Sequence, residues 1–224
     1  MELDRDAGAL VELERVLELD PAHEGGLQLA GYVAGGMGRR AEAVAYYTRY
    51  LQFMPGNASV RMRVAYDLAQ AGDPEGALQL IQEGLDRDPE NLDLWEQFGG
   101  YSFTVGESIN REYEGGDGGE VAPGAVMYFR DAIGAYERVR AGRGVETPAR
   151  HLISIAAAYV RLGELSNAVL AASDGLEIYP EEARLWSIYA DALRGTDRLE
   201  LALDALALVQ EIDPEYSNIG LRRG

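Results

Sequence analysis

Apolar residues recur along the chain at the spacing of amphipathic helices, rather than in the alternation typical of strands. Two clear examples are Leu27, Ala30, Gly31 and Ala34, and Leu152, Ile155, Ala156 and Tyr159. Prolines follow several of these runs and mark helix ends, because proline cannot donate to the helical hydrogen-bond ladder. The pattern predicts an all-α chain of short helices that are separated by tight turns.

Three columns of residues repeat at one period. The prolines that follow an apolar run are Pro21, Pro55, Pro89, Pro180 and Pro214, with gaps of 34, 34, 91 and 34 residues. The long gap is two periods plus 23 residues. Small residues (Gly31, Ala65, Gly99, Ala156, Ala190) and turn glycines (Gly38, Gly72, Gly106, Gly163) give the same period and the same insertion. This agreement indicates a repeat array.

The period and residue types resemble the tetratricopeptide repeat family, as in GLQLAGYVAGGMGRRAEAVAYYTRYLQFMP and LWSIYADALRGTDRLELALDALALVQEIDP. Trp95 and Trp186 fill the large position near the start of a first helix. The small position that opens each second helix holds Ala43, Ala77, Ala168 and Ala202. Asp197 and Arg61 depart from the pattern, replacing a turn glycine and an apolar residue. The resemblance implies a right-handed superhelical solenoid of helix–turn–helix repeats, with one repeat lengthened by an insertion.

The repeat boundaries follow from the columns. We expect a half repeat at 1–23, repeats at 24–57, 58–91, 92–148, 149–182 and 183–216, and a tail at 217–224, all in one solenoid domain. In the half repeat, one apolar face is expected to hold Ala9, Leu13, Val16, Leu17 and Leu19. This helix is interpreted as a natural cap or, preferably, as the edge of a segment cut from a longer protein.

The third repeat carries the 23 extra residues. Fourteen lie between the two helices and nine follow the second helix, where 141–148 is expected to be a loop. We expect a long helical hairpin with helices at about 92–114 and 123–141, tipped by the glycines of 115–119. The alternative is a disordered acidic loop over 107–121.

Composition narrows the function. The 224 residues include no cysteine and no lysine, and the formal net charge is -18. Nucleic-acid partners are disfavoured because their binding depends on phosphate neutralisation. No apolar run is long enough for direct membrane insertion. The absence of lysine excludes a Walker-A motif, and the absence of cysteine excludes thiolate chemistry. The use of arginine without lysine favours a bacterial source. Localisation in the cytoplasm and localisation in the periplasm are both compatible with the sequence.

Three chemical motifs favour structural explanations. Gly36–Ala41 fits a dinucleotide fingerprint, but a helix precedes it rather than a strand. The acidic residues Glu112, Glu114, Asp117 and Glu120 lack the spacing of a calcium loop. His23 and His151 belong to no nucleophile or metal motif. We therefore predict no enzyme activity, no cofactor and no metal site.

The resemblance implies a concave groove, lined by the first helices, that binds peptides. Helical geometry places two groups of residues on its edge. The first is Tyr32, Met62, Tyr66 and Phe103, which either meet a partner or pack against neighbouring helices. The second is Arg150, Arg161, Arg184 and Arg194, which either hold a carboxylate or form ordinary surface ion pairs. The carboxylate-clamp members of the family bind chaperone C-termini through lysine and asparagine at fixed groove positions. Those residues are absent here, so specificity for chaperone C-termini is not expected.

These observations predict a protein–protein interaction module, an adaptor or assembly scaffold that binds a peptide segment in its groove. The partner is expected to be a protein or peptide, with an acidic or carboxylate-bearing segment favoured. One alternative is a self-assembling scaffold, a homo-oligomer formed through the terminal helices. Another is the non-catalytic segment of a larger bacterial envelope export or polysaccharide machine.

Overall fold

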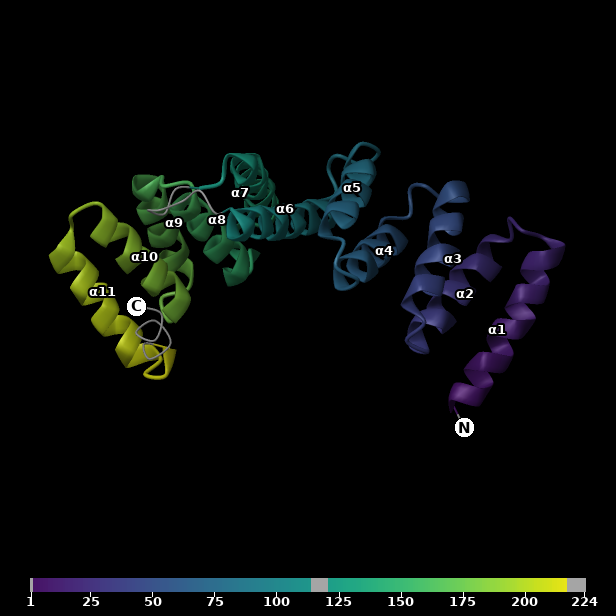
Figure 1. The fold of residues 1–224 in the computed structure, drawn as a ribbon. Coiled ribbons are helices and arrows are strands. Elements are labelled where there is room, and N and C mark those ends of the chain that lie inside the picture. The colour runs from purple at the N-terminus through teal and green to yellow at the C-terminus, as the bar shows by residue number, and fades with distance from the viewer. Residues whose placement is uncertain (1, 114–120, 217–224) are drawn as a thin grey trace. The chain divides into compact units, whose positions relative to one another are not determined.

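The computed structural model describes residues 2–113 and 121–216, and within these ranges the regular structure is helical, with no strand (Figure 1). The chain divides into two compact units, the N-terminal unit of residues 1–97 and the C-terminal unit of residues 98–224. Each unit is described by itself. The expected hairpin tip at 115–119 and the tail at 217–224 lie outside the described residues.

The N-terminal unit is a run of antiparallel helix pairs. Its helices are α1 (Glu2–Leu19), α2 (Glu24–Gly36), α3 (Arg40–Phe53), α4 (Ala58–Gln70) and α5 (Pro74–Leu85), followed by the start of α6 (Leu92–Glu112). From α1 to α5, each helix packs against the next in the sequence. The stripe predicted for the first repeat is confirmed, because Leu27, Ala30, Gly31 and Ala34 are all buried.

The C-terminal unit continues the same organisation. It contains the rest of α6, then α7 (Pro123–Arg143), the short 3-10 helix η1 (Gly144–Glu146), α8 (Ala149–Arg161), α9 (Leu165–Ile178), α10 (Ala183–Gly195) and α11 (Leu199–Ile212). Its core is built around Phe129, Leu152, Ile155 and Leu185. The small alanines that open the second helices are buried, as the close approach of paired helices requires.

Local sequence explains where the helices begin and end. Side-chain oxygens of Asn57 and Asp73 accept hydrogen bonds from the N–H groups of Val60 and Gly76, which caps α4 and α5. Turns between paired helices use Gly38, Gly72 and Gly163 with positive φ. In the last repeat Asp197 takes this position with a φ of 59°, so the departure from glycine leaves the turn conformation unchanged.

The lengthened repeat is helical on both sides of the insertion. Helices α6 and α7 have 21 residues each, against 12 to 14 in the helices of the other full repeats. Phe103 and Phe129 meet edge to face across them, and the Asn110 side chain accepts a hydrogen bond from the Ala122 N–H. The prediction of helix is confirmed through Glu112, where the alternative placed a loop from residue 107.

Three local expectations are wrong. Gly106 is not a turn glycine but lies inside α6, where the missing side chain lets the Phe129 ring approach. The loop expected at 141–148 is shorter, since α7 continues to Arg143 and η1 follows. On α1 the buried face is centred on Leu10 and Leu17, whereas Ala9, Val16 and Leu19 are exposed. Leu13 and Leu17 of the expected face do pack into the core, so the expectation is wrong only for the other three residues and for the omission of Leu10.

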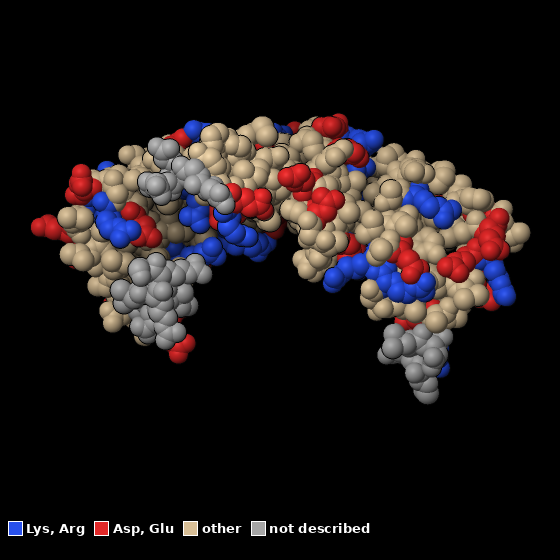
Figure 2. Space-filling model, viewed as in Figure 1, with Lys and Arg blue, Asp and Glu red and all other residues tan. Residues whose placement is uncertain are grey.

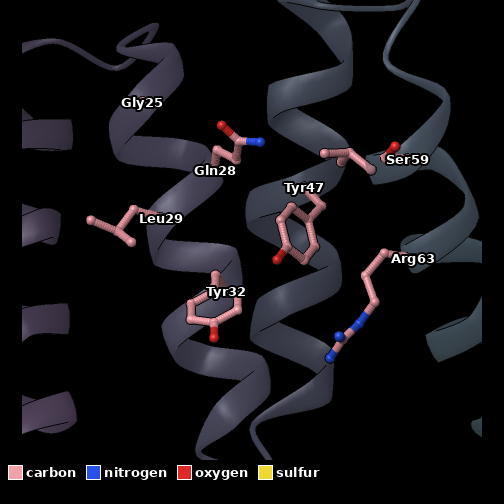
Figure 3. Close-up of a pocket in the computed structure, with 8 residues that line it drawn as sticks. Gly25, Gln28, Leu29, Tyr32, Tyr47, Ser59 and Arg63 are labelled. Atoms are coloured by element: carbon pink, nitrogen blue, oxygen red, sulfur yellow. The ribbon is translucent and has the colours of Figure 1, made fainter.

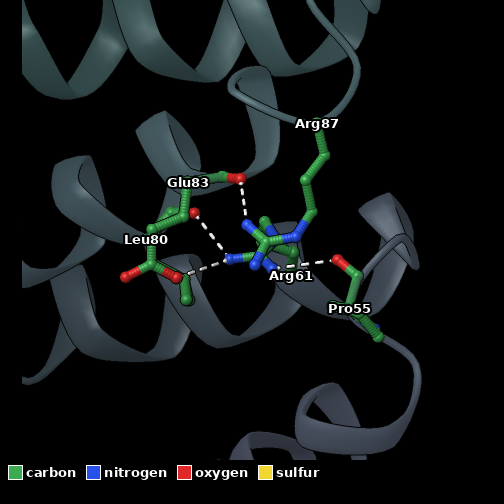
Figure 4. Close-up of polar contacts among 5 residues, drawn as sticks. All are labelled: Pro55, Arg61, Leu80, Glu83 and Arg87. Carbon is green, nitrogen blue, oxygen red and sulfur yellow. Dashed lines mark hydrogen bonds and ion pairs between the residues drawn. The ribbon is translucent and has the colours of Figure 1, made fainter.

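Arg61 shows how a charged residue fits a column that is usually apolar. Its guanidinium is buried in the N-terminal unit, where it donates hydrogen bonds to the carbonyl oxygens of Leu80 and Pro55, each at 3.0 Å. It also meets Glu83 Oε2 at 3.2 Å (Figure 4). Burial of a charge is tolerated here because its donors are satisfied by hydrogen bonds and by an opposite charge.

Candidate functional site

A groove in the N-terminal unit lies between the first helices α2 and α4. It has a volume of about 320 Å3 and is lined by Gly25, Gln28, Leu29, Tyr32, Tyr47, Ser59, Val60 and Arg63. Figure 3 shows the Tyr32 and Gln28 side chains on α2, Tyr47 between the two helices, and Arg63 on the opposite wall. The lining combines aromatic rings with a few polar groups, which is typical of a recognition surface.

The floor of the groove is set by Tyr47 from α3. A Cβ atom at Gly31 would lie 2.6 Å from a Tyr47 ring carbon, so the glycine is what allows the ring to lie against α2. Burial raises the pKa of the Tyr47 phenol. Tyr47 therefore stays neutral and acts as a rigid apolar surface with a polar tip.

The polar wall of the groove is an arginine held by a buried acid. Arg63 Nε donates a hydrogen bond of 3.0 Å to Asp67 Oδ2, and the Asp67 side chain is 1% exposed. Arg40 Nε lies 3.7 Å from the other Asp67 oxygen. The hydrogen bond to Asp67 raises the pKa of the Arg63 guanidinium. Two arginines thus share one carboxylate, so this group of three side chains carries one excess positive charge.

Three of the sequence-predicted aromatic and methionine positions fall in the N-terminal unit. Tyr32 lines the groove with 69% of its surface exposed, and Tyr66 is 50% exposed on α4. Met62 is half-buried on α4. Tyrosines exposed to this degree offer a large contact area at a low cost in side-chain entropy.

The fourth, Phe103, lies in the C-terminal unit on α6. It is half-buried, and its ring centroid is 5.6 Å from that of Phe129 in an edge-to-face contact. It packs against the core of that unit. Of the two interpretations offered by the sequence, a partner contact or packing against neighbouring helices, the second describes the main contact of Phe103.

The four predicted arginines are all exposed in the C-terminal unit. Arg161 Nε donates to Glu107 Oε1 at 2.6 Å, and Arg194 pairs with Asp191 at 3.2 Å. Arg150 and Arg184 lie in the first turns of α8 and α10. Figure 2 shows basic side chains gathered among acidic ones on the surface of this unit. Convergence of the four on one ligand stays a prediction.

Sequence reasoning missed Arg63, Arg40 and Tyr47. A charged residue on an amphipathic helix is usually solvated, so Arg63 carried no distinguishing signal. The signal that could have found it is Asp67, which stands four residues later on the same helix face. Tyr47 is in the second helix of its repeat, whereas the search for groove residues considered the first helices.

The two histidines have structural surroundings. His23 Nδ1 accepts a hydrogen bond from the Gly26 N–H and caps α2. His151 is buried and stacks on the Tyr136 ring at 4.8 Å. Among residues 2–113 and 121–216, no three histidine, aspartate or glutamate side chains form a group that could hold a metal ion. Over the same ranges, none of the helices combines the length and the apolar character needed to span a bilayer.

Comparison with known proteins agrees with the repeat architecture. Residues 36–97 match the family model described as "Tetratricopeptide repeat". A crystal structure of MamA protein is 18% identical, with a TM-score of 0.66 over 84% of this chain and 90% of that chain. MamA from Desulfovibrio magneticus RS-1 is 15% identical, with a TM-score of 0.67 over 86% of this chain and 96% of that chain. No curated protein sequence matches this chain.

Residues 36–97 therefore match tetratricopeptide repeats, and the all-α, helix–turn–helix repeat fold with one lengthened repeat is confirmed. This fold is a non-catalytic framework that supports protein-interaction and scaffold modules in general. At these identities the likeness to MamA concerns the fold alone.

Proposed function

We propose that this chain is a protein-interaction module that binds an extended segment of a partner in the groove between α2 and α4. The observation that carries the proposal is the aromatic lining of that groove, to which the exposed Tyr32 and the buried Tyr47 both contribute. Exposed tyrosines beside a rigid floor bury much area on binding while they lose little side-chain freedom.

The charge of the groove favours an acidic or carboxylate-bearing segment. Arg63 and Arg40 together carry two positive charges against the single carboxylate of Asp67. The Asp67 contact holds the Arg63 guanidinium in place, which lowers the entropy cost of a further hydrogen bond to a ligand. A ligand carboxylate at this wall would gain a charge-assisted contact.

Peptide selection on the full chain tests this function. Random 12-residue peptides displayed on phage are selected on the wild-type protein and, in parallel, on Tyr32→Ser. We expect the wild-type pool to be enriched in peptides that carry an acidic residue next to an apolar one, and these peptides to bind Tyr32→Ser about tenfold more weakly.

The control is Tyr113→Ser, which removes an exposed tyrosine from outside the groove. Peptides that bind all three proteins equally, or a wild-type pool without acidic residues, would contradict the proposal. Circular dichroism verifies that each variant keeps the helical content of the wild type.

A further inference from the structure

The last helix of the C-terminal unit carries an apolar strip with no helix of the described chain over it. Leu199, Leu203 and Leu206 stand at i, i+4 and i+7 on α11 and are 58%, 66% and 47% exposed. The helix is attached to α10 through an adjacent side, about a quarter turn away, where Ala202, Ala205 and Val209 are buried. Three leucines in line at this spacing form the kind of stripe that one helix presents to another.

In the preceding repeat, the equivalent strip on α9 is covered by the next helix. The residues 34 positions earlier on α9 are Leu165, Val169 and Ala172. Val169 and Ala172 are buried, and the Leu165 side chain lies against Gly195 of α10. The next first helix, α10, therefore covers on α9 the face that no described helix covers on α11. Figure 1 shows the order of the three helices.

Comparison with the α9–α10 contact also indicates what kind of helix would fit the strip on α11. On α10 the side that meets Val169 of α9 contributes Ala192 and Leu193. On α11 leucines replace the valine and the alanine, so the surface is bulkier and an occupant needs small residues opposite them. The strip therefore fits an amphipathic helix whose apolar face mixes alanine with leucine-sized side chains.

Charge selects among helices of that shape. Glu200, Asp204 and Glu211 form an exposed stripe beside the leucines, and α11 contains no basic residue. A second copy of the chain would bring a net charge of -18 to this stripe. Its other terminal helix, α1, is itself acidic, with Glu12, Glu14 and Glu18 exposed. Like charges placed together oppose association, whereas basic residues along the edge of a partner helix are attracted.

We propose that α11 docks an amphipathic helix of another protein, one that flanks its apolar stripe with arginine or lysine. The surface is separate from the α2–α4 groove and takes a helix rather than an extended segment. A failure of either proposal therefore leaves the other standing.

Two helical peptides test the proposal on the full chain. Both carry the same leucine and alanine stripe, and they differ only in having arginine or glutamate along its edges. We expect the arginine peptide to bind in fluorescence anisotropy, more weakly as salt rises, and the glutamate peptide to bind at least about tenfold more weakly. The double variant Leu203→Ser with Leu206→Ser should bind the arginine peptide about tenfold more weakly than the wild type does.

Matched variants locate the site. Leu170→Ser removes an exposed leucine from the outer face of α9, and Leu201→Ser removes one from the other side of the acidic stripe on α11. Both should bind the arginine peptide as the wild type does. Glu200→Lys with Asp204→Lys should reverse the preference between the two peptides.

Several results would overturn the proposal. The first is no binding of the arginine peptide, and the second is equal binding of the two peptides. The third is a loss of affinity in Leu170→Ser as large as in Leu203→Ser with Leu206→Ser. Concentration-dependent dimerisation in sedimentation that Leu203→Ser with Leu206→Ser abolishes would show that a second copy occupies the strip. It would also support the predicted self-assembly through terminal helices.

Discussion

Arg61 donates a hydrogen bond of 3.0 Å to the carbonyl oxygen of Pro55, the residue six positions earlier. Trp95 and Trp186 occupy the same repeat column, and their indole N–H groups donate to Pro89 and Pro180 at 2.8 and 2.7 Å. In each case the bond ties the loop that follows a second helix to the start of the next first helix. Arginine therefore replaces tryptophan as the donor, and three repeats share this junction, whereas Leu27 and Leu152 occupy the same column in the other two.

This relationship predicts the cost of changing Arg61. Arg61→Ala leaves the Pro55 and Leu80 carbonyls without their donor and opens a cavity, so we expect a loss of about 2–4 kcal/mol in the free energy of unfolding. Arg61→Trp keeps a donor for Pro55 and should cost about half as much. Urea denaturation followed by circular dichroism measures both; an equal loss in the two variants would show that the Pro55 bond has no part in stability.

Two arginine–acid pairs span one repeat period and connect α7 with the α9 region. Arg130 pairs with Glu164, and Arg140 pairs with Asp174 at 2.8 Å. The hydrogen bonds from Arg130 and Asn167 lower the pKa of Glu164 below its ordinary value of 4.5. A lowered folded-state pKa adds stability that is present above the unfolded-state pKa and is lost as the pH falls through the folded-state pKa.

We therefore expect Glu164→Gln to be less stable than the wild type at pH 7, by no more than about 1 kcal/mol for a surface pair. The difference should shrink as the pH falls below about 4, where the wild-type carboxyl becomes protonated. Urea unfolding at several pH values measures this difference. A difference that is constant from pH 7 to pH 3 would exclude the ion pair as its cause.

The close approach of paired helices predicts a strong response to added volume. Ala77 and Ala168 are each 0% exposed at the start of a second helix. Ala77→Trp or Ala168→Trp should lower the free energy of unfolding by about 1–3 kcal/mol or more through overpacking. The control Ala141→Trp, at an exposed position on α7, should leave thermal stability nearly unchanged. Wild-type stability in both buried variants would contradict the repeat alignment.

The repeat period, the helices and their buried faces could be predicted from the sequence. Gly31 and Ala34 are buried as expected because a 3.6-residue spacing fixes which side chains share a face. The two long helices beside the insertion could be predicted as well, since Pro123 limits where the second can begin and the glycines limit how far the first can extend.

The partners of charged side chains could not be predicted in this way. Arg161 reaches Glu107, a residue 54 positions earlier, because the insertion lengthens α6 alongside it. Arg61 is satisfied by main-chain carbonyls, which a sequence pattern does not display. Such contacts depend on how helices pack rather than on the spacing along any one of them.

The predicted arginine site has its own test. Arg150→Glu with Arg184→Glu reverses two exposed charges of the C-terminal unit. If these residues attract an acidic partner, the double variant should bind acidic peptides from the parallel selection on Tyr32→Ser more weakly, with a flatter dependence on salt. Arg161→Ala removes one charge instead of reversing two, so it should have a smaller effect. Wild-type binding by the double variant would leave the four arginines as ordinary surface charges.

The most direct test of the proposed groove is the affinity of one selected acidic peptide for three proteins in isothermal titration calorimetry. Tyr32→Ala should weaken binding about tenfold while its salt dependence stays close to that of the wild type, because an apolar contact is lost and the charges of Arg63 and Arg40 remain. Tyr113→Ala, an exposed tyrosine outside the groove, should bind with wild-type affinity. Equal affinity of the peptide for the wild type and Tyr32→Ala would contradict the assignment of the α2–α4 groove as the binding site.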